Sequence, residues 1–286
     1  MDALMEDERQ KGLTGFNLKY LAMVCMLLDH IEYIFGFTGK VPIVLSWIGR
    51  ISAPIFLFCV IEGFTHTHDK KKYILRIYAI SILMGAIRFG FYNVLSGFVR
   101  GDGFTPQNAM LSSFVILLVV LSGIYLCSQK RFVLGITAIV VPVILPYVVM
   151  WLFQMLQGNV NALFFINLAT FTICPLHTAI ADGGTATLVA GVAMYLCRKS
   201  RPKQVIAFAI VCILFDIVRV FALVPQVTLS GFIFEYFEWM EIFSIIPMLL
   251  YNGERGNGNK KLFYWFYPLH IYILYAISFV VYNFLY

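Results

Sequence analysis

Long apolar runs follow one another along almost the whole chain, and several of them carry ionisable side chains. Hydrophobic residues make up 60% of the 286 residues and charged residues 13%, whereas charged residues make up about 25% of a typical soluble domain. A transmembrane helix needs about 20 consecutive, mostly apolar residues. The sequence is therefore suited to a bilayer, and a soluble globular fold is excluded.

We predict an all-α polytopic membrane protein with about nine transmembrane helices. The stretch 157–181 is ambiguous because it is apolar but contains Asn161, Asn167 and Pro175; a tenth span, a re-entrant segment and an interfacial helix all fit it. Residues 1–17 are expected to form a cytoplasmic tail, and residues 18–286 a single membrane domain. The nine helices are expected at 18–37, 44–65, 73–97, 109–127, 132–156, 182–198, 204–224, 232–251 and 262–285.

Basic residues concentrate in alternate loops, which predicts the orientation of the chain. By the positive-inside rule, the N-terminus is cytoplasmic and the C-terminus extracytoplasmic. The net charge of +6 is then explained by topology and by contact with membrane lipids, and no nucleic-acid partner is expected. The basic clusters lie at 9–19, 70–76, 130–131, 198–203 and 255–261.

An aspartate and a histidine, Asp29 and His30, interrupt the first apolar run. An ionisable residue at the centre of a spanning helix costs about 2.5 kcal/mol or more and is usually functional. At 1.5 Å per helical residue, His30 and Arg50 are both expected roughly 10 Å below the outer surface. The alternative is an internal salt-bridge network without a reaction. Further charges expected in this outer layer are Arg88, Asp216, Arg219, Glu238 and Glu241.

A second polar layer is expected at the cytoplasmic side. Its basic residues could bind the phosphates of a cytosolic cosubstrate. The simpler alternative is that they set the topology and touch anionic lipid. The candidates for cosubstrate binding are Glu62, Lys70, Lys71, Lys72, Arg76 and His270.

Two features near Arg50 predict how it is presented. Gly49 and Ala53 have the small-xxx-small spacing that lets two membrane helices approach closely, and the first helix is the expected neighbour. Pro54 lacks the N–H that would bond the carbonyl of Arg50. Both features would expose Arg50 to a cavity, although packing alone also explains them.

A histidine and an arginine in a dry pocket are suited to acyl transfer. Histidine takes and returns a proton near neutral pH, and an arginine can stabilise the oxyanion of a tetrahedral intermediate. The six cysteines form no C-x-x-C pair and lie mostly in apolar runs, so neither a metal site nor a disulfide framework is expected. These residues alone do not separate an enzyme from a proton-coupled transporter.

The chain resembles the TraX family, named for the membrane protein associated with acetylation of conjugative pilin, over nearly its whole length. The resemblance rests on LDH at 28–30, GR at 49–50, EGF at 62–64 and YPLH at 267–270. Asn108 and Asp182 also match. Through this family the chain is distantly similar to the multi-pass acyltransferases that use cytosolic acetyl-CoA.

The resemblance implies an acetyltransferase in the bacterial cytoplasmic membrane, with acetyl-CoA as cosubstrate. Asp29, His30 and Arg50 are the expected catalytic residues. The acceptor would be an amine or hydroxyl of an extracytoplasmic or membrane-embedded peptide, lipid or glycan. The alternatives are a proton-coupled transporter and a non-catalytic assembly factor. The residues expected at the acceptor are Asn108, Asp182 and Glu241.

Overall fold

The computed structural model describes residues 12–180 and 183–285, and the regular structure of these residues is helical. Their one β pairing is an isolated bridge between Leu13 and Tyr251. Within the described residues, seven helices are long and apolar enough to cross a membrane, so the protein is a polytopic membrane protein. These seven segments are Gly15–Thr38, Val44–His66, Lys70–Asn93, Met110–Ser128, Phe132–Met155, Arg201–Leu223 and Lys261–Phe284.

Two of the nine predicted spans are not long helices. At 182–198 the structure has α9 (Gly184–Leu196), which has 13 residues, fewer than the roughly 20 that a span needs. At 232–251 the chain is broken into three short pieces. Pro247 contributes to the break, since a proline fits the first turn of a helix but not its interior. The pieces are α12 (Leu229–Phe234), the 3₁₀ helix η5 (Phe237–Ser244) and α13 (Ile245–Leu249).

The ambiguous stretch 157–181 contains the helix α8 (Val160–Phe171) and the short 3₁₀ helix η3 (His177–Ala179). The 12 residues of α8 extend about 18 Å, compared with about 30 Å for the hydrocarbon core. Thus α8 is too short to cross as a regular helix.

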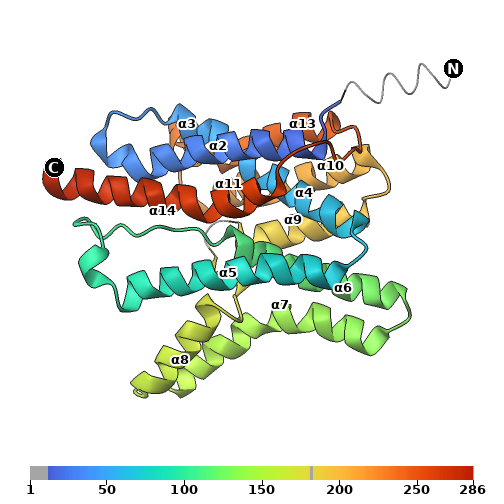
Figure 1. Ribbon diagram of the computed structural model, residues 1–286, viewed down its shortest axis with the longest axis horizontal. Coiled ribbons are helices and arrows are strands. Elements are labelled where there is room, and N and C mark those ends of the chain that lie inside the picture. Colours follow the sequence, from blue (N-terminus) through green and yellow to red (C-terminus); the bar gives the residue numbers. More distant parts are fainter. Residues whose placement is uncertain (1–11, 181–182, 286) are drawn as a thin grey trace. The chain divides into compact units, whose positions relative to one another are not determined.

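The chain divides into two compact units. The first contains the chain up to Gly63 and Ala193–Leu274, and the second contains Phe64–Val192 and the chain from Tyr275 onward. In the first unit, α2 (Gly15–Phe35) packs along α3 (Val44–Gly49), as Figure 1 shows. Also in this unit, α10 (Arg201–Cys212) packs on α13 and η5. A π-helical turn, η4 (Ile213–Val218), joins α10 to α11 (Arg219–Leu223).

In the second unit, α6 (Met110–Ser128) packs between α5 (Lys70–Asn93) and α7 (Phe132–Met155), and α5 also contacts α8 (Figure 1). Many large apolar side chains of α7 are exposed, Val133 by 80%. In a membrane protein such a surface faces lipid, which solvates it without cost. The remaining elements are α4 (Ser52–His66), α14 (Lys260–Leu285), η1 (Gly36–Thr38) and η2 (Ser96–Phe98).

The start of α2 is held by the loop that precedes α14. The first N–H groups of a helix have no partner within the helix, and here Gly15 N–H donates to the Glu254 carbonyl at 2.8 Å and Phe16 N–H to the Arg255 carbonyl at 3.1 Å. Asn252 N–H donates to the Leu13 carbonyl at 3.0 Å. The loop therefore fixes the position from which α2 enters the first unit.

Candidate functional site

Asp29 and Arg50 form an ion pair between α2 and the break that separates α3 from α4. Arg50 and Ile51 lie outside both helices. The cause is Pro54, which cannot donate to the Arg50 carbonyl and so interrupts the helix one turn earlier. The lost bond at Pro54 thus interrupts the helix, and the guanidinium of Arg50 lies against the Asp29 carboxylate; its exposure to a cavity stays a prediction.

Gly49 allows this contact. A Cβ at position 49 would lie 2.3 Å from the Cβ of Asp29 and 2.6 Å from its Oδ1. The predicted close approach of the first two spans is therefore confirmed at Gly49. A second bond joins the same spans nearby, because Ser46 Oγ donates to Glu32 Oε2 at 2.8 Å.

His30 contacts His270 across 240 residues of sequence. Nδ1 of His30 lies 2.8 Å from Nε2 of His270, and Nδ1 of His270 lies 2.7 Å from the carbonyl oxygen of Phe266. The Phe266 ring also stacks on the His270 ring, with centroids 4.7 Å apart and planes at 5°. His270 is 7% exposed, so its ring is fixed by packing as well as by hydrogen bonds.

These two bonds determine where the protons lie in a neutral pair. A carbonyl oxygen only accepts, so His270 Nδ1 must carry a proton and donate it. Neutral His270 then has a lone pair on Nε2, which accepts from a proton on His30 Nδ1. The remaining lone pair of the dyad is on His30 Nε2, the atom from which a base would act.

The structure corrects the prediction of two separate polar layers. His270, expected near the cytoplasmic surface, lies beside His30, and Arg50 is paired with Asp29, the residue before His30. Counting residues from predicted loops failed because helices differ in tilt and in the depth at which they begin. One centre therefore contains Asp29, His30, Arg50 and His270.

The predicted basic residues for cosubstrate binding lie at the start of α5, in the second unit. Lys70 has a structural contact, since its Nζ donates to the carbonyls of Phe64 at 3.0 Å and Thr67 at 3.3 Å. Such bonds complete the end of a preceding helix. Outside the spans, the N–H of Lys72 lowers the pKa of the Asp69 carboxyl. Lys71, Lys72 and Arg76 are exposed.

Glu62, also predicted near the cosubstrate, forms a two-pronged ion pair with Arg201. Both Arg201 Nη atoms lie 3.2 Å from a Glu62 carboxylate oxygen, and Nη1 also donates to Gln204 Oε1 at 2.6 Å. The Arg201 guanidinium lies over the rings of Phe58 and Tyr251, 4.5 and 4.9 Å from their centroids. Sequence reasoning had treated Arg201 as a topology signal alone, because nothing local distinguishes it from its basic neighbours.

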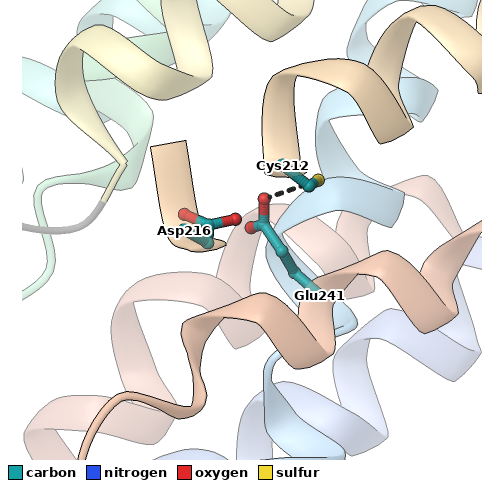
Figure 2. Close-up of side chains that lie close together, drawn as sticks. All are labelled: Cys212, Asp216 and Glu241. Carbon is teal, nitrogen blue, oxygen red and sulfur yellow. Dashed lines mark hydrogen bonds between the residues drawn. The ribbon is translucent and has the colours of Figure 1, made fainter. Parts of the chain in front are cut away.

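The three residues expected at the acceptor have different surroundings. Asn108 is buried before α6, with 7% of its surface exposed. Asp182 lies outside the described residues. Glu241 belongs to a cluster with Cys212 and Asp216 (Figure 2). Arg88, expected in the outer layer, lies over the Phe171 ring at 4.9 Å.

Comparison with known proteins gives two matches. The model of the family described as TraX protein matches residues 15–278. The chain is 22% identical over 275 residues to "Probable fimbrial assembly protein FimC, serogroup H1" of Dichelobacter nodosus, which covers 93% of this chain and 96% of that protein. No solved structure matches the chain.

Proposed function

Because the chain belongs to the TraX family, we propose that it is a membrane acetyltransferase using cytosolic acetyl-CoA. The geometric observation that supports this proposal is the chain from the Phe266 carbonyl through His270 to His30. These hydrogen bonds orient His30 as a base, and Arg50 is held near it by its ion pair with Asp29. Acyl transfer needs a base for the nucleophile and a positive group for the oxyanion.

In the proposed reaction, His30 Nε2 takes a proton from the acceptor amine or hydroxyl as that atom attacks the thioester carbonyl. Arg50 donates to the oxyanion that forms, and Asp29 holds Arg50 in place. When the intermediate collapses, the carbon–sulfur bond breaks and the thiolate of coenzyme A takes the proton from His30. The products are the acetylated acceptor and free coenzyme A, and His30 is restored.

We assign His270 a positioning role in place of the cosubstrate contact expected from the sequence. Lys71, Lys72 and Arg76 remain the candidates for the phosphates of acetyl-CoA. The name of the Dichelobacter nodosus relative favours a polypeptide of a surface fibre as the acceptor class. An amine at the N-terminus of such a subunit would be the nucleophile.

The test is acetyl transfer from acetyl-CoA by the purified full-length protein in nanodiscs. We expect His30→Ala to lower the rate by about 10²–10⁴-fold, the usual contribution of a general base. His270→Phe removes the acceptor for His30 Nδ1–H, whereas His270→Gln keeps an acceptor oxygen and should retain more activity. His68→Ala, a change at an exposed histidine, is the matched control.

Wild-type turnover in His30→Ala would reject the mechanism. If turnover were retained in His30→Ala but lost in His270→Phe, the base would have to be reassigned to His270. Monodisperse elution and unchanged coenzyme A binding show that each variant is folded.

A second candidate, a non-catalytic assembly factor, is favoured by the name of the relative alone. In that case the Asp29–Arg50 pair would serve only packing, and the neutral double variant Asp29→Asn/Arg50→Gln should support fibre assembly in cells. Loss of assembly in this variant, together with loss of acetyl transfer, favours the enzyme.

We further propose that the protein lies in the bacterial cytoplasmic membrane with its N-terminus inside and its C-terminus outside. The seven long helices alone would give this orientation, but a cytoplasmic position for the basic cluster at 198–203 also requires α9 and the broken segment 229–249 each to carry the chain across. Irregular backbone is tolerated at membrane depth where protein surrounds it.

A further inference from the structure

Three side chains that bind metals converge in the first unit. Cys212 ends α10, Asp216 lies in the π-helical turn η4, and Glu241 lies in η5. Figure 2 shows the Glu241 carboxylate between the other two side chains. The Cys212 thiol donates to Glu241 Oε1 at 3.0 Å, and one ligand atom from each residue lies within 4.8 Å of the others.

Two irregular elements create this convergence. Cys212 and Asp216 are four residues apart, and the wider turn of η4 carries the chain from one to the other. Short π-helical turns within α-helices are uncommon and occur frequently at functional sites. On the other side, η5 is a 3₁₀ helix, in which residues three apart share one face. Glu238 and Glu241 are therefore both on the side of η5 that bears the cluster.

The charge around the cluster is unbalanced. Glu238 and Arg219 both act electrostatically on Asp216, and Arg50 acts on Glu241 but is already paired with Asp29. Glu238 and Arg219 are exposed, whereas Asp216 and Glu241 are half-buried and lie side by side. Two neighbouring carboxylates inside a membrane protein need either a shared proton or a bound cation to balance their charge.

One oxygen in the cluster lacks a donor. Asp216 Oδ2 is buried and has no hydrogen-bond donor among the described residues as long as the carboxyl groups are ionised. The Glu241 carboxyl is near enough to bond Asp216 if it carries a proton. A buried acceptor without a partner costs about 1–3 kcal/mol, and more when charged. Within the cluster, the Cys212 thiol donates its hydrogen bond to Glu241. It therefore does not donate to Asp216 Oδ2. A bound cation would satisfy Oδ2 and balance the charge of the two carboxylates together.

We propose that Cys212, Asp216 and Glu241 bind one Zn²⁺ ion. A thiolate with two carboxylates suits zinc better than the harder Mg²⁺ or Ca²⁺ ions, which prefer oxygen ligands alone. Zinc bonds sulfur at about 2.3 Å and carboxylate oxygen at roughly 2.0–2.2 Å, so small side-chain rotations bring all three atoms into contact with it. Water takes the fourth position.

Binding is an exchange of a proton for the metal. Zn²⁺ forms a bond to Cys212 Sγ, the S–H bond breaks, and the proton goes to bulk water. The hydrogen bond from Cys212 to Glu241 is replaced by bonds from both atoms to the ion. No electron is transferred. The proposal does not depend on the acetyltransferase activity.

The test is metal titration of the purified full-length protein in detergent after treatment with a chelator. We expect calorimetry to show one Zn²⁺ site per chain, and Co²⁺ in its place to give a thiolate-to-cobalt charge-transfer band. Cys212→Ser should abolish the band. Glu241→Gln and Asp216→Asn, which keep the side-chain shapes, should weaken Zn²⁺ binding by about tenfold or more. Cys197→Ser, a change at another free cysteine of the first unit, should leave both signals unchanged.

The main competing explanation is that Asp216 and Glu241 share protons. Infrared spectroscopy would then show a protonated carboxyl band that is lost in Glu241→Gln and persists at saturating Zn²⁺. That result would overturn the proposal. The proposal would also fail if the wild-type protein bound no Zn²⁺, or if the cobalt band persisted in Cys212→Ser. If Cys212→Ser does not fold, the infrared measurement and Glu241→Gln decide the question.

Discussion

Replacing Gly49 by alanine tests whether the close approach of α2 and α3 builds the Asp29–Arg50 pair. The new Cβ would lie 2.3 Å from Asp29 Cβ and 2.6 Å from Asp29 Oδ1, whereas carbon atoms pack at about 3.5–4.0 Å. The overlap must be relieved by separating the helices or by turning Asp29 away from Arg50. Either change damages the ion pair.

The size of the effect follows from opposing contributions. Overpacking costs about 1–3 kcal/mol, and loss of a half-buried ion pair adds roughly 1–2 kcal/mol after allowance for solvent screening. Replacing a glycine in a helix by alanine stabilises the helix by at most about 1 kcal/mol, which offsets part of this loss. We expect a net destabilisation of about 1–3 kcal/mol, which lowers the unfolding midpoint by roughly 3–10 °C.

Thermal unfolding in detergent, followed by tryptophan fluorescence, measures this shift, and acetyl transfer measures the damage to the site. Gly97→Ala is the matched control, because a Cβ there meets no atom within 4 Å. If Gly49→Ala matched both the wild type and this control in midpoint and in rate, the argument that Gly49 is needed for the contact would be refuted.

Three further outcomes are expected. Glu62→Gln should destabilise the protein by roughly 2–3 kcal/mol in thermal unfolding, because it leaves the mostly buried charge of Arg201 without its carboxylate; an unchanged midpoint would contradict this. Outside the spans, the guanidinium of Arg100 lowers the pKa of Asp102, so this contribution to stability is present above about pH 4 and is lost as the pH falls through the lowered pKa. The unfolding midpoint of the wild type should therefore fall more steeply on acidification than that of Asp102→Asn, and parallel curves would exclude the effect. A single cysteine at position 200 in a cysteine-depleted chain should react only with reagents applied from the cytoplasmic side; labelling from outside would contradict the proposed crossing by α9 and the cytoplasmic position of the basic cluster at 198–203.

The sequence predicted the features that depend on local chemistry. Apolar runs located the long helices, and the small residue and the proline around Arg50 predicted both the close approach and the interrupted helix. The prediction of one long helix at 232–251 was wrong, because the average hydropathy of the segment hides the effect of a single proline and of three regularly spaced glutamates. Glu235 follows the end of α12 and Pro247 lies in the first turn of α13, whereas Glu238 and Glu241 lie within η5.

Contacts between distant segments could not be predicted in this way. His30 and His270 are both visible as histidines in apolar runs, yet nothing in either run specifies the other as its partner. The same is true of Glu241, which joins Cys212 and Asp216 from a separate element. The four-residue spacing of the latter two was a detectable signal, but it is too common to indicate a site without the third residue.

The loop that holds the start of α2 has a consequence for biosynthesis. Chains are inserted into the membrane from the N-terminus as they are translated, so α2 enters long before Glu254 and Arg255 exist. Its first N–H groups acquire these partners, and His30 acquires His270, only after the last span has been made. A chain that ends before residue 270 therefore cannot assemble the centre, because the contacts that complete it come from the last helix.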